Sequence, residues 1–282
     1  MSLVREAKSS LARLGASPRK RLGQNFMVDE ETLSFIADSL SLKEGETVLE
    51  IGAGLGFLTR RLAETGARVA AVEKDKAYAG YLRNFFKDRP VEIFQKDILD
   101  TDLKRDLNAE APLKVAGNIP YNITSLILEW LIGQRALVSE AVLTVQWEVG
   151  ERLRAVPGGK SWGPLSIFVQ VYSDVSLLKK IGRRSFYPAP EVDSSLLKFR
   201  FPEAPAVPPE TEKIFFYLVR KAFQKRRKTL RNALVEVSEA FSSAGISGQR
   251  RPETLSIAEW AGLSEKIHAL KTPGADIIKG DI

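Results

Sequence analysis

The sequence predicts an α/β fold with a seven-stranded, mostly parallel sheet, followed by a smaller all-helical domain. Two observations predict this class. In residues 47–201, short apolar runs alternate with amphipathic helical patterns, which is typical of parallel strands joined by crossover helices. After a proline-rich stretch at 202–209, only helical patterns follow. The early strand candidates are continuous apolar runs, so we expect a doubly wound sheet whose two faces are both covered by helices.

Seven runs are predicted as strands, and glycine or proline bounds the helices between them. Gly66 ends a helical pattern at 57–65, and Pro90 follows another at 76–88. A long proline-containing loop separates the last two strands, so we expect them to form an antiparallel pair at an edge of the sheet. The predicted strands are Thr47–Ile51, 68–73, 91–95, 113–116, 141–146, 174–178 and 195–201.

Residues 202–209 read PEAPAVPP, which is too rich in proline to continue a strand or to enter a helix interior. We therefore predict a first domain at 1–201, a stiff linker at 202–209, a helical domain at 210–270 and a flexible tail at 271–282. The helices of the second domain are predicted at 210–223, 229–244, 257–261 and 264–270.

The composition excludes several kinds of site. Without cysteine there is no disulfide framework, thiolate nucleophile or cysteine zinc site, and a single histidine, His268, argues against a histidine triad or a multi-histidine metal site. We therefore expect no metal. No apolar run has the length of a membrane span and no signal peptide is evident, so we expect a cytoplasmic protein without a membrane partner.

The net charge of +7 is concentrated in two short segments. Residues 1–25 contain six basic side chains and one acid, and residues 213–231 contain eight basic side chains and no acid. Two basic patches on an otherwise mildly acidic chain predict contact with nucleic acid, and two solvated helix faces are the alternative. The candidate RNA-binding residues are Arg19, Lys20, Arg21, Arg220, Lys221, Lys225, Arg226, Arg227, Lys228 and Arg231.

Ligand-type residues follow the first three strands. The glycines of Glu50–Gly56 (EIGAGLG) would let the backbone turn sharply and approach a ligand, although G-x-G-x-G is not the dinucleotide fingerprint and also fits a bare turn. Glu73 can accept hydrogen bonds from ribose hydroxyls, and Asp97 from an adenine amino group. Helix N-caps are the alternative role for these acids. Together they predict an adenosine pocket formed by Gly52, Gly54, Gly56, Glu73, Lys74, Asp97 and Ile98.

The tetrapeptide Asn118–Tyr121 (NIPY) follows the fourth strand and is typical of enzymes that methylate an exocyclic amino group of a base. That nitrogen is a poor nucleophile because its lone pair is delocalised into the ring. Acceptors on the Asn118 side chain and the Ile119 carbonyl would favour a more nucleophilic nitrogen, and Pro120 would fix the turn. Tyr121 offers a face for stacking on an extruded base. An ordinary turn is the alternative.

This chemistry needs no strong base, because the sulfonium of S-adenosylmethionine is already an activated methyl donor and the enzyme contributes alignment. That agrees with a chain whose only histidine, His268, lies in the predicted helical domain, where a surface or packing role is expected. The predicted first domain is therefore a Rossmann-like methyltransferase domain dependent on S-adenosylmethionine, which becomes S-adenosylhomocysteine.

Four blocks make the sequence resemble the KsgA/Dim-type ribosomal RNA adenine dimethyltransferases, which are related to the erythromycin-resistance methyltransferases. They are LGQNFMVD at 22–29, the glycine block at 50–56, NIPY at 118–121 and FYPAPEVDS at 186–194. The resemblance implies that Gln24, Asn25 and Met27 line the methionine end of the cofactor, beside Asn118, and that Phe186 sandwiches the target base with Tyr121. The basic block at 220–232 also resembles the family's and implies docking on rRNA.

The resemblance further implies the product N6,N6-dimethyladenosine at two adjacent adenines near the 3′ end of 16S rRNA, modified on a partly assembled small subunit whose biogenesis the protein also monitors. One alternative is a large-subunit adenine target, as in the resistance enzymes. Another is a mainly non-catalytic assembly factor, although intact Glu73, Asp97, Asn118 and Tyr121 argue against it. A nicotinamide oxidoreductase is disfavoured by the glycine spacing. We expect a monomer.

Overall fold

The computed structural model describes residues 2–19, 23–109 and 112–269, so the predicted tail at 271–282 lies outside the described residues. The chain divides into two compact units, which are described separately. The first comprises Met1–Gly150 and Asp174–Phe201, and the second comprises Glu151–Ser173 and Pro202–Ile282. This division differs from the predicted domains in the segment Glu151–Ser173, which we expected in the first domain.

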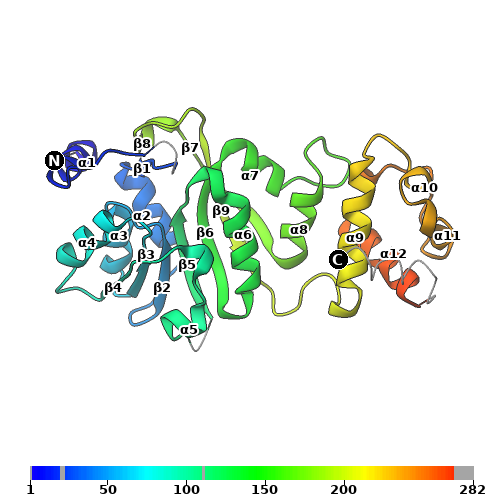
Figure 1. Ribbon diagram of the computed structural model, residues 1–282, viewed down its shortest axis with the longest axis horizontal. Coiled ribbons are helices and arrows are strands. Elements are labelled where there is room, and N and C mark those ends of the chain that lie inside the picture. Colours follow the sequence, from blue (N-terminus) through cyan, green and yellow to red (C-terminus); the bar gives the residue numbers. More distant parts are fainter. Residues whose placement is uncertain (1, 20–22, 110–111, 270–282) are drawn as a thin grey trace. The chain divides into compact units, whose positions relative to one another are not determined.

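The first unit contains a seven-stranded sheet with strand order β4-β3-β2-β5-β6-β9-β7 (Figure 1). The first five strands in this order are parallel, whereas β9 pairs antiparallel with both β6 and β7. The predicted α/β class, the seven strands and the antiparallel edge pair are thus confirmed. The strands are β2 (Thr47–Ile51), β3 (Arg68–Val72), β4 (Val91–Phe94), β5 (Leu113–Asn118), β6 (Val138–Gln146), β7 (Asp174–Ile181) and β9 (Ser194–Arg200).

Helices cover the parallel part of the sheet, and acidic caps fix the starts of three of them. Asp29, Asp75 and Asp102 each accept a backbone N–H bond in the first turn of the helix that follows them. α3 contacts β3, α4 contacts β4 and α2 contacts α3. These helices lie at the end of the sheet that β4 forms (Figure 1). The helices are α2 (Glu30–Ser39), α3 (Phe57–Glu64), α4 (Lys76–Phe85), α5 (Leu103–Leu107) and α6 (Thr124–Gly133).

Two elements near the N-terminus were not predicted. α1 (Leu3–Arg13) buries Leu3, Ala7 and Leu11 in the core of the first unit. These residues recur at helical spacing, so the pattern needed to find α1 was present in the sequence. A two-stranded antiparallel ribbon joins β1 (Phe26–Met27) to β8 (Phe186–Tyr187), with Met27 opposite Phe186. The ribbon brings together two of the sequence blocks that carry the family resemblance.

The second unit is helical, and the segment Glu151–Ser173 belongs to it because of apolar packing. Helix α8 (Pro164–Tyr172) contacts α9 (Pro209–Gln224), and the ring centroids of Phe168 and Phe216 lie 5.7 Å apart. The Trp162 indole N–H, fully buried in this unit, donates a 3.0 Å bond to the Leu255 carbonyl. These aromatic contacts are long-range, so the local pattern did not indicate them. Helix α7 (Trp147–Leu153) leads the chain into this unit.

Two predictions for the second unit are corrected. The helix expected at 229–244 is three short turns, because asparagine, serine and β-branched residues in this stretch disfavour a continuous helix. The two helices expected at 257–261 and 264–270 form the single helix α12 (Ile257–Ala269), since Gly262 is tolerated where Trp260 and Leu263 are buried. The predicted linker is partly packed, with Val207 fully buried. The short turns are α10 (Leu230–Ala233), a 3-10 turn at Val235–Val237 and α11 (Ala240–Ser243).

Candidate active site

A cavity of about 950 Å³ lies in the first unit, at the carboxyl ends of β2, β3, β4 and β5. The strand order reverses between β2 and β5, which is where open α/β sheets bind ligands. The structure brings most of the sequence-predicted cofactor residues into the lining of this cavity. They are Gln24, Asn25, Met27, Gly52, Gly54, Glu73, Lys74, Asp97, Ile98 and Asn118. Arg19 and Pro120, which we predicted for other roles, also line the cavity.

The glycine loop after β2 has left-handed backbone at each of its three glycines. A Cβ atom on Gly54 would lie 3.0 Å from the ring of Phe26, so this glycine lets the loop approach the N-terminal block. Gly56 does not line the cavity. A Cβ atom there would lie 2.7 Å from Leu82, which shows that Gly56 serves the packing of α3 against α4.

Glu73 connects the end of β3 to the glycine loop. Its side chain is 7% exposed, Oε2 accepts a 2.8 Å bond from the Gly54 N–H, and Oε1 accepts a 2.7 Å bond from the Asp75 N–H. Burial raises the pKa of Glu73 above its ordinary value, although the two N–H groups oppose this rise. Each oxygen keeps a second lone pair for a ligand.

Asp97 follows β4, and its carboxylate is anchored at both oxygens. Oδ2 pairs with Lys74 Nζ at 2.5 Å, and Oδ1 accepts a 3.1 Å bond from the Leu99 N–H. Ile98 beside it is 5% exposed and lines the cavity. The predicted alternative role of Asp97 as a cap is also realised, because it caps the 3-10 turn Ile98–Asp100.

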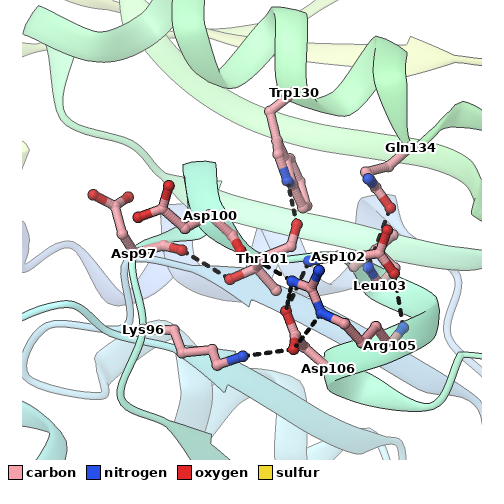
Figure 2. A network of polar contacts seen from close by, with 10 residues as sticks. All are labelled: Lys96, Asp97, Asp100, Thr101, Asp102, Leu103, Arg105, Asp106, Trp130 and Gln134. Carbon is pink, nitrogen blue, oxygen red and sulfur yellow. Dashed lines mark hydrogen bonds and ion pairs between the residues drawn. The ribbon is translucent and has the colours of Figure 1, made fainter.

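The loop that carries Asp97 is held by a polar network that the sequence did not reveal (Figure 2). Thr101 Oγ1 donates a 2.8 Å bond to the Asp97 carbonyl, and Trp130 Nε1 donates a 2.7 Å bond to the Thr101 carbonyl. The Leu103 N–H donates to Gln134 Oε1 at 3.1 Å. Because Trp130 and the Gln134 cap belong to α6, this helix fixes the loop at two points.

Glu50 is a cavity residue that we did not predict. It is 2% exposed, and its Oε2 has no hydrogen-bond partner among the described residues. Burial, followed by the charge of Glu73, raises the pKa of Glu50 to about 8, whereas contacts with Thr59 oppose the rise. The available signal was a single acid within the strand Thr47–Ile51 (TVLEI), next to the apolar residues Val48, Leu49 and Ile51.

At the other end of the cavity, the Asn118 side chain ends β5 and is bonded through both of its polar atoms. Nδ2 donates a 2.7 Å bond to the Asn25 carbonyl, and Oδ1 accepts a 2.7 Å bond from Thr144 Oγ1. The first bond joins the N-terminal block to the tetrapeptide across 93 residues of sequence. Within the tetrapeptide, Pro120 lines the cavity and Ile119 is buried, with 2% exposure.

Comparison with known proteins identifies the family. The family model described as ribosomal RNA adenine dimethylase matches residues 15–269. A relative from Geobacter metallireducens, named ribosomal RNA small subunit methyltransferase A, is 44% identical over 91% of this chain and 98% of its own length. The protein of the same name from Moorella thermoacetica is 41% identical over 95% and 96%. The chain belongs to the ribosomal RNA adenine dimethylase family.

Solved structures agree with this dimethylase assignment. The 23S rRNA methyltransferase ErmE matches with a TM-score of 0.70 and 28% identity, covering 86% of this chain and 99% of ErmE. A dimethyladenosine transferase from Plasmodium falciparum has a TM-score of 0.73 and 23% identity, over 88% and 98% of the two chains, and shows the shared fold. The resemblance that the four sequence blocks indicated is therefore confirmed.

The two aromatic residues predicted for this dimethylase are not part of the cavity lining. Tyr121 is half-buried, and its hydroxyl lies 2.5 Å from Ser194 Oγ. Phe186 is 3% exposed and pairs with Met27 in the β1–β8 ribbon. The block at 186–194 thus contacts the N-terminal block at one end and the tetrapeptide at the other.

The basic residues that we predicted to bind RNA differ in their solvent exposure and in whether a nearby group pairs with their charge. Arg19 is exposed and pairs with Asp75 at 3.5 Å, while positions 20 and 21 lie outside the described residues. In the second unit, Lys221 is half-buried and pairs with Glu236 at 2.5 Å. Arg226 donates a 2.7 Å bond to the Lys160 carbonyl. The exposed members of the patch are Arg220, Lys225, Arg227, Lys228 and Arg231.

The described part of this dimethylase contains no cluster of three or more histidine, aspartate or glutamate side chains that could hold a metal ion. Within the same residues, each helix is too short or too polar to cross a membrane.

Proposed function

We propose that this chain transfers methyl groups from S-adenosylmethionine to the exocyclic N6 of two adjacent adenines near the 3′ end of 16S rRNA, giving N6,N6-dimethyladenosine. The observation that carries the proposal is that Asn118 and Pro120 line the same cavity as Glu73 and Asp97. Relatives with 41–44% identity that are named for the small subunit support the choice of RNA.

The nucleoside end of the cavity has the chemistry to hold adenosine. Glu73 would accept ribose hydroxyls through the lone pairs that the Gly54 and Asp75 N–H groups leave free. Asp97 would accept a bond from the adenine amino group, with Ile98 against the ring. Because the anchors of both carboxylates come from the protein itself, these acceptors are in place before a ligand binds.

The other end of the cavity suits the methionine portion. Gln24, Asn25 and Met27, which the family resemblance assigns to the methionine portion of the cofactor, line this end. When bound, S-adenosylmethionine supplies an activated methyl group on its sulfonium, so no strong base is needed.

Asn118 would act on the nucleophile. Its Oδ1 keeps a second lone pair beside the bond from Thr144, and with the Ile119 carbonyl it would accept the two amino hydrogens of the target adenine. Pro120, with a φ of −60°, fixes the turn that follows. These acceptors favour a pyramidal nitrogen whose lone pair is available for attack.

The target base would stack on Tyr121, whose ring is oriented by the contact between its hydroxyl and Ser194. We retain Phe186 as the second aromatic of the sandwich, although its 3% exposure makes it the less accessible of the two. Extrusion of the base is required because N6 takes part in pairing and stacking within a helix.

The basic patches would bind the RNA backbone, one through Arg19, which lines the cavity, together with Lys20 and Arg21, and the other through residues 220–231 of the second unit. We propose that the chain acts as a cytoplasmic monomer on a precursor of the small subunit and assists its biogenesis. A large-subunit target is the second candidate, because ErmE shares 28% identity and the fold.

One assay separates the two targets. The chain is incubated with labelled S-adenosylmethionine and either undermethylated small subunits or naked large-subunit RNA. We expect label in adenine of the small subunit and background incorporation in the large-subunit RNA. Transfer to large-subunit RNA alone would select the second candidate, and transfer to neither would refute the proposed activity.

A further inference from the structure

Thr144 is a buried polar residue within an apolar strand. It is fully buried in β6, where the neighbouring residues Val142, Leu143 and Val145 are also fully buried. The parallel register of β5 and β6 places Thr144 directly opposite Asn118. A buried hydroxyl in such surroundings requires a hydrogen-bond partner.

The partner of the Thr144 hydroxyl is the Asn118 side chain. The distance from Thr144 Oγ1 to Asn118 Oδ1 is 2.7 Å, and the distance to the Gly117 carbonyl is 3.3 Å. A hydroxyl has one hydrogen, and the shorter distance indicates that Thr144 donates this hydrogen to Asn118 Oδ1 and not to the Gly117 carbonyl. At its other end, the Asn118 amide donates from Nδ2 to the Asn25 carbonyl at 2.7 Å.

The Asn25 carbonyl permits only one orientation of the amide, and the Thr144 hydroxyl holds the oxygen end of the amide in that orientation. A carbonyl can only accept, so Nδ2 must face Asn25, and Oδ1 then faces the hydroxyl of Thr144. The reversed amide would place Oδ1 against the Asn25 carbonyl and would leave two acceptors facing each other. The orientation matters for chemistry, because only the oxygen of this amide can accept a hydrogen from an amino group.

We propose that Thr144 is a positioning residue for methyl transfer, which fixes the Asn118 amide with its oxygen available to the substrate amino group. This inference rests on the proposed function, in which Asn118 is the acceptor. Thr144 itself does not line the cavity, so its effect is on the transfer rate and not on cofactor affinity.

The test compares Thr144→Val, which keeps the shape but removes the hydroxyl, with Thr144→Ser, which keeps the hydroxyl. Single-turnover methyl transfer to undermethylated small subunits is measured at saturating S-adenosylmethionine, together with cofactor affinity and thermal unfolding. Loss of one hydrogen bond predicts a rate about tenfold lower for the valine variant, recovery in the serine variant and an unchanged cofactor Kd. Thr211→Val removes a buried hydroxyl in the second unit and is the matched control.

A double variant separates this inference from the proposed function. If Thr144 acts through Asn118, adding Thr144→Val to Asn118→Ala lowers the rate no further. An equal loss in both backgrounds, a parallel loss of cofactor affinity or a wild-type rate for the valine variant would overturn the inference. A wild-type rate for Asn118→Ala would instead refute the role of Asn118 in the proposed function. If the valine variant does not fold, Thr144→Ala is measured in the same way.

Discussion

The two ends of the cavity are built in different ways. At the nucleoside end, Glu73 and Asp97 follow successive strands and are held by neighbours close in sequence, such as Asp75 and Leu99. At the transfer end, Asn118 is bonded to Asn25 across 93 residues of sequence. The comparison shows that each acid combines a contact within its own turn with a contact from a more distant residue, whereas both contacts that orient the Asn118 amide come from other parts of the chain.

The largest expected effect is at the transfer end. Asn118→Ala removes the acceptor for the amino group, so we expect the single-turnover rate to fall about 100-fold, while the Kd for S-adenosylmethionine changes little. Rapid-quench assays and calorimetric titration measure the two quantities. If cofactor affinity fell as much as the rate did, the two ends would not be functionally distinct.

A substitution at the nucleoside end should lower cofactor affinity and leave the transfer rate nearly unchanged. Asp97→Ala removes the proposed acceptor for the adenine amino group and the partner of Lys74, so we expect about 30-fold weaker cofactor binding and a transfer rate at saturation close to that of the wild type. Asp100→Ala, at an exposed acid that does not line the cavity, is the control. Equal losses in the two variants would indicate a general effect of charge on the loop.

The positions of the acids could be predicted from the sequence because parallel strands bring their carboxyl ends to one edge of the sheet. The anchors could not. Trp130 holds the Asp97 loop from α6, and Thr144 meets Asn118 only through the strand register. Gly56 differs from the other two glycines of the motif, because it lies outside the cavity lining and is packed closely against Leu82. Local pattern located the candidate site, and long-range packing determines its geometry.

A third expected effect is on the affinity for the RNA substrate, and it involves neither end of the cavity. Replacing the exposed residues Arg227 and Lys228 with alanine should weaken binding to small subunits about tenfold and flatten its salt dependence, with cofactor affinity unchanged. Lys221→Ala, where Glu236 already pairs with the charge, should have a smaller effect. Filter binding at several salt concentrations measures both. A larger loss for Lys221→Ala would mean that the exposed charges do not contact RNA.

The smallest effect is on the pH dependence of stability. The pKa of Glu50 is raised to about 8, so the stability contributed by its protonated form is fully present below the ordinary pKa of 4.5 and is lost as the pH rises through 8. Glu50→Gln has no such loss, so its Tm should rise relative to the wild type by about 3 °C between pH 6 and pH 9. The exposed Glu92→Gln is the control. A constant difference across this range would contradict the raised pKa.

The most direct test of the account is mass spectrometry of small-subunit RNA from cells that lack this chain. Without the chain, N6,N6-dimethyladenosine at the two adjacent adenines should be absent. The wild-type chain should restore it, and Asn118→Ala, which removes the proposed acceptor for the amino group, should not. Dimethyladenosine that persists without the chain, or that Asn118→Ala restores in full, would contradict the account.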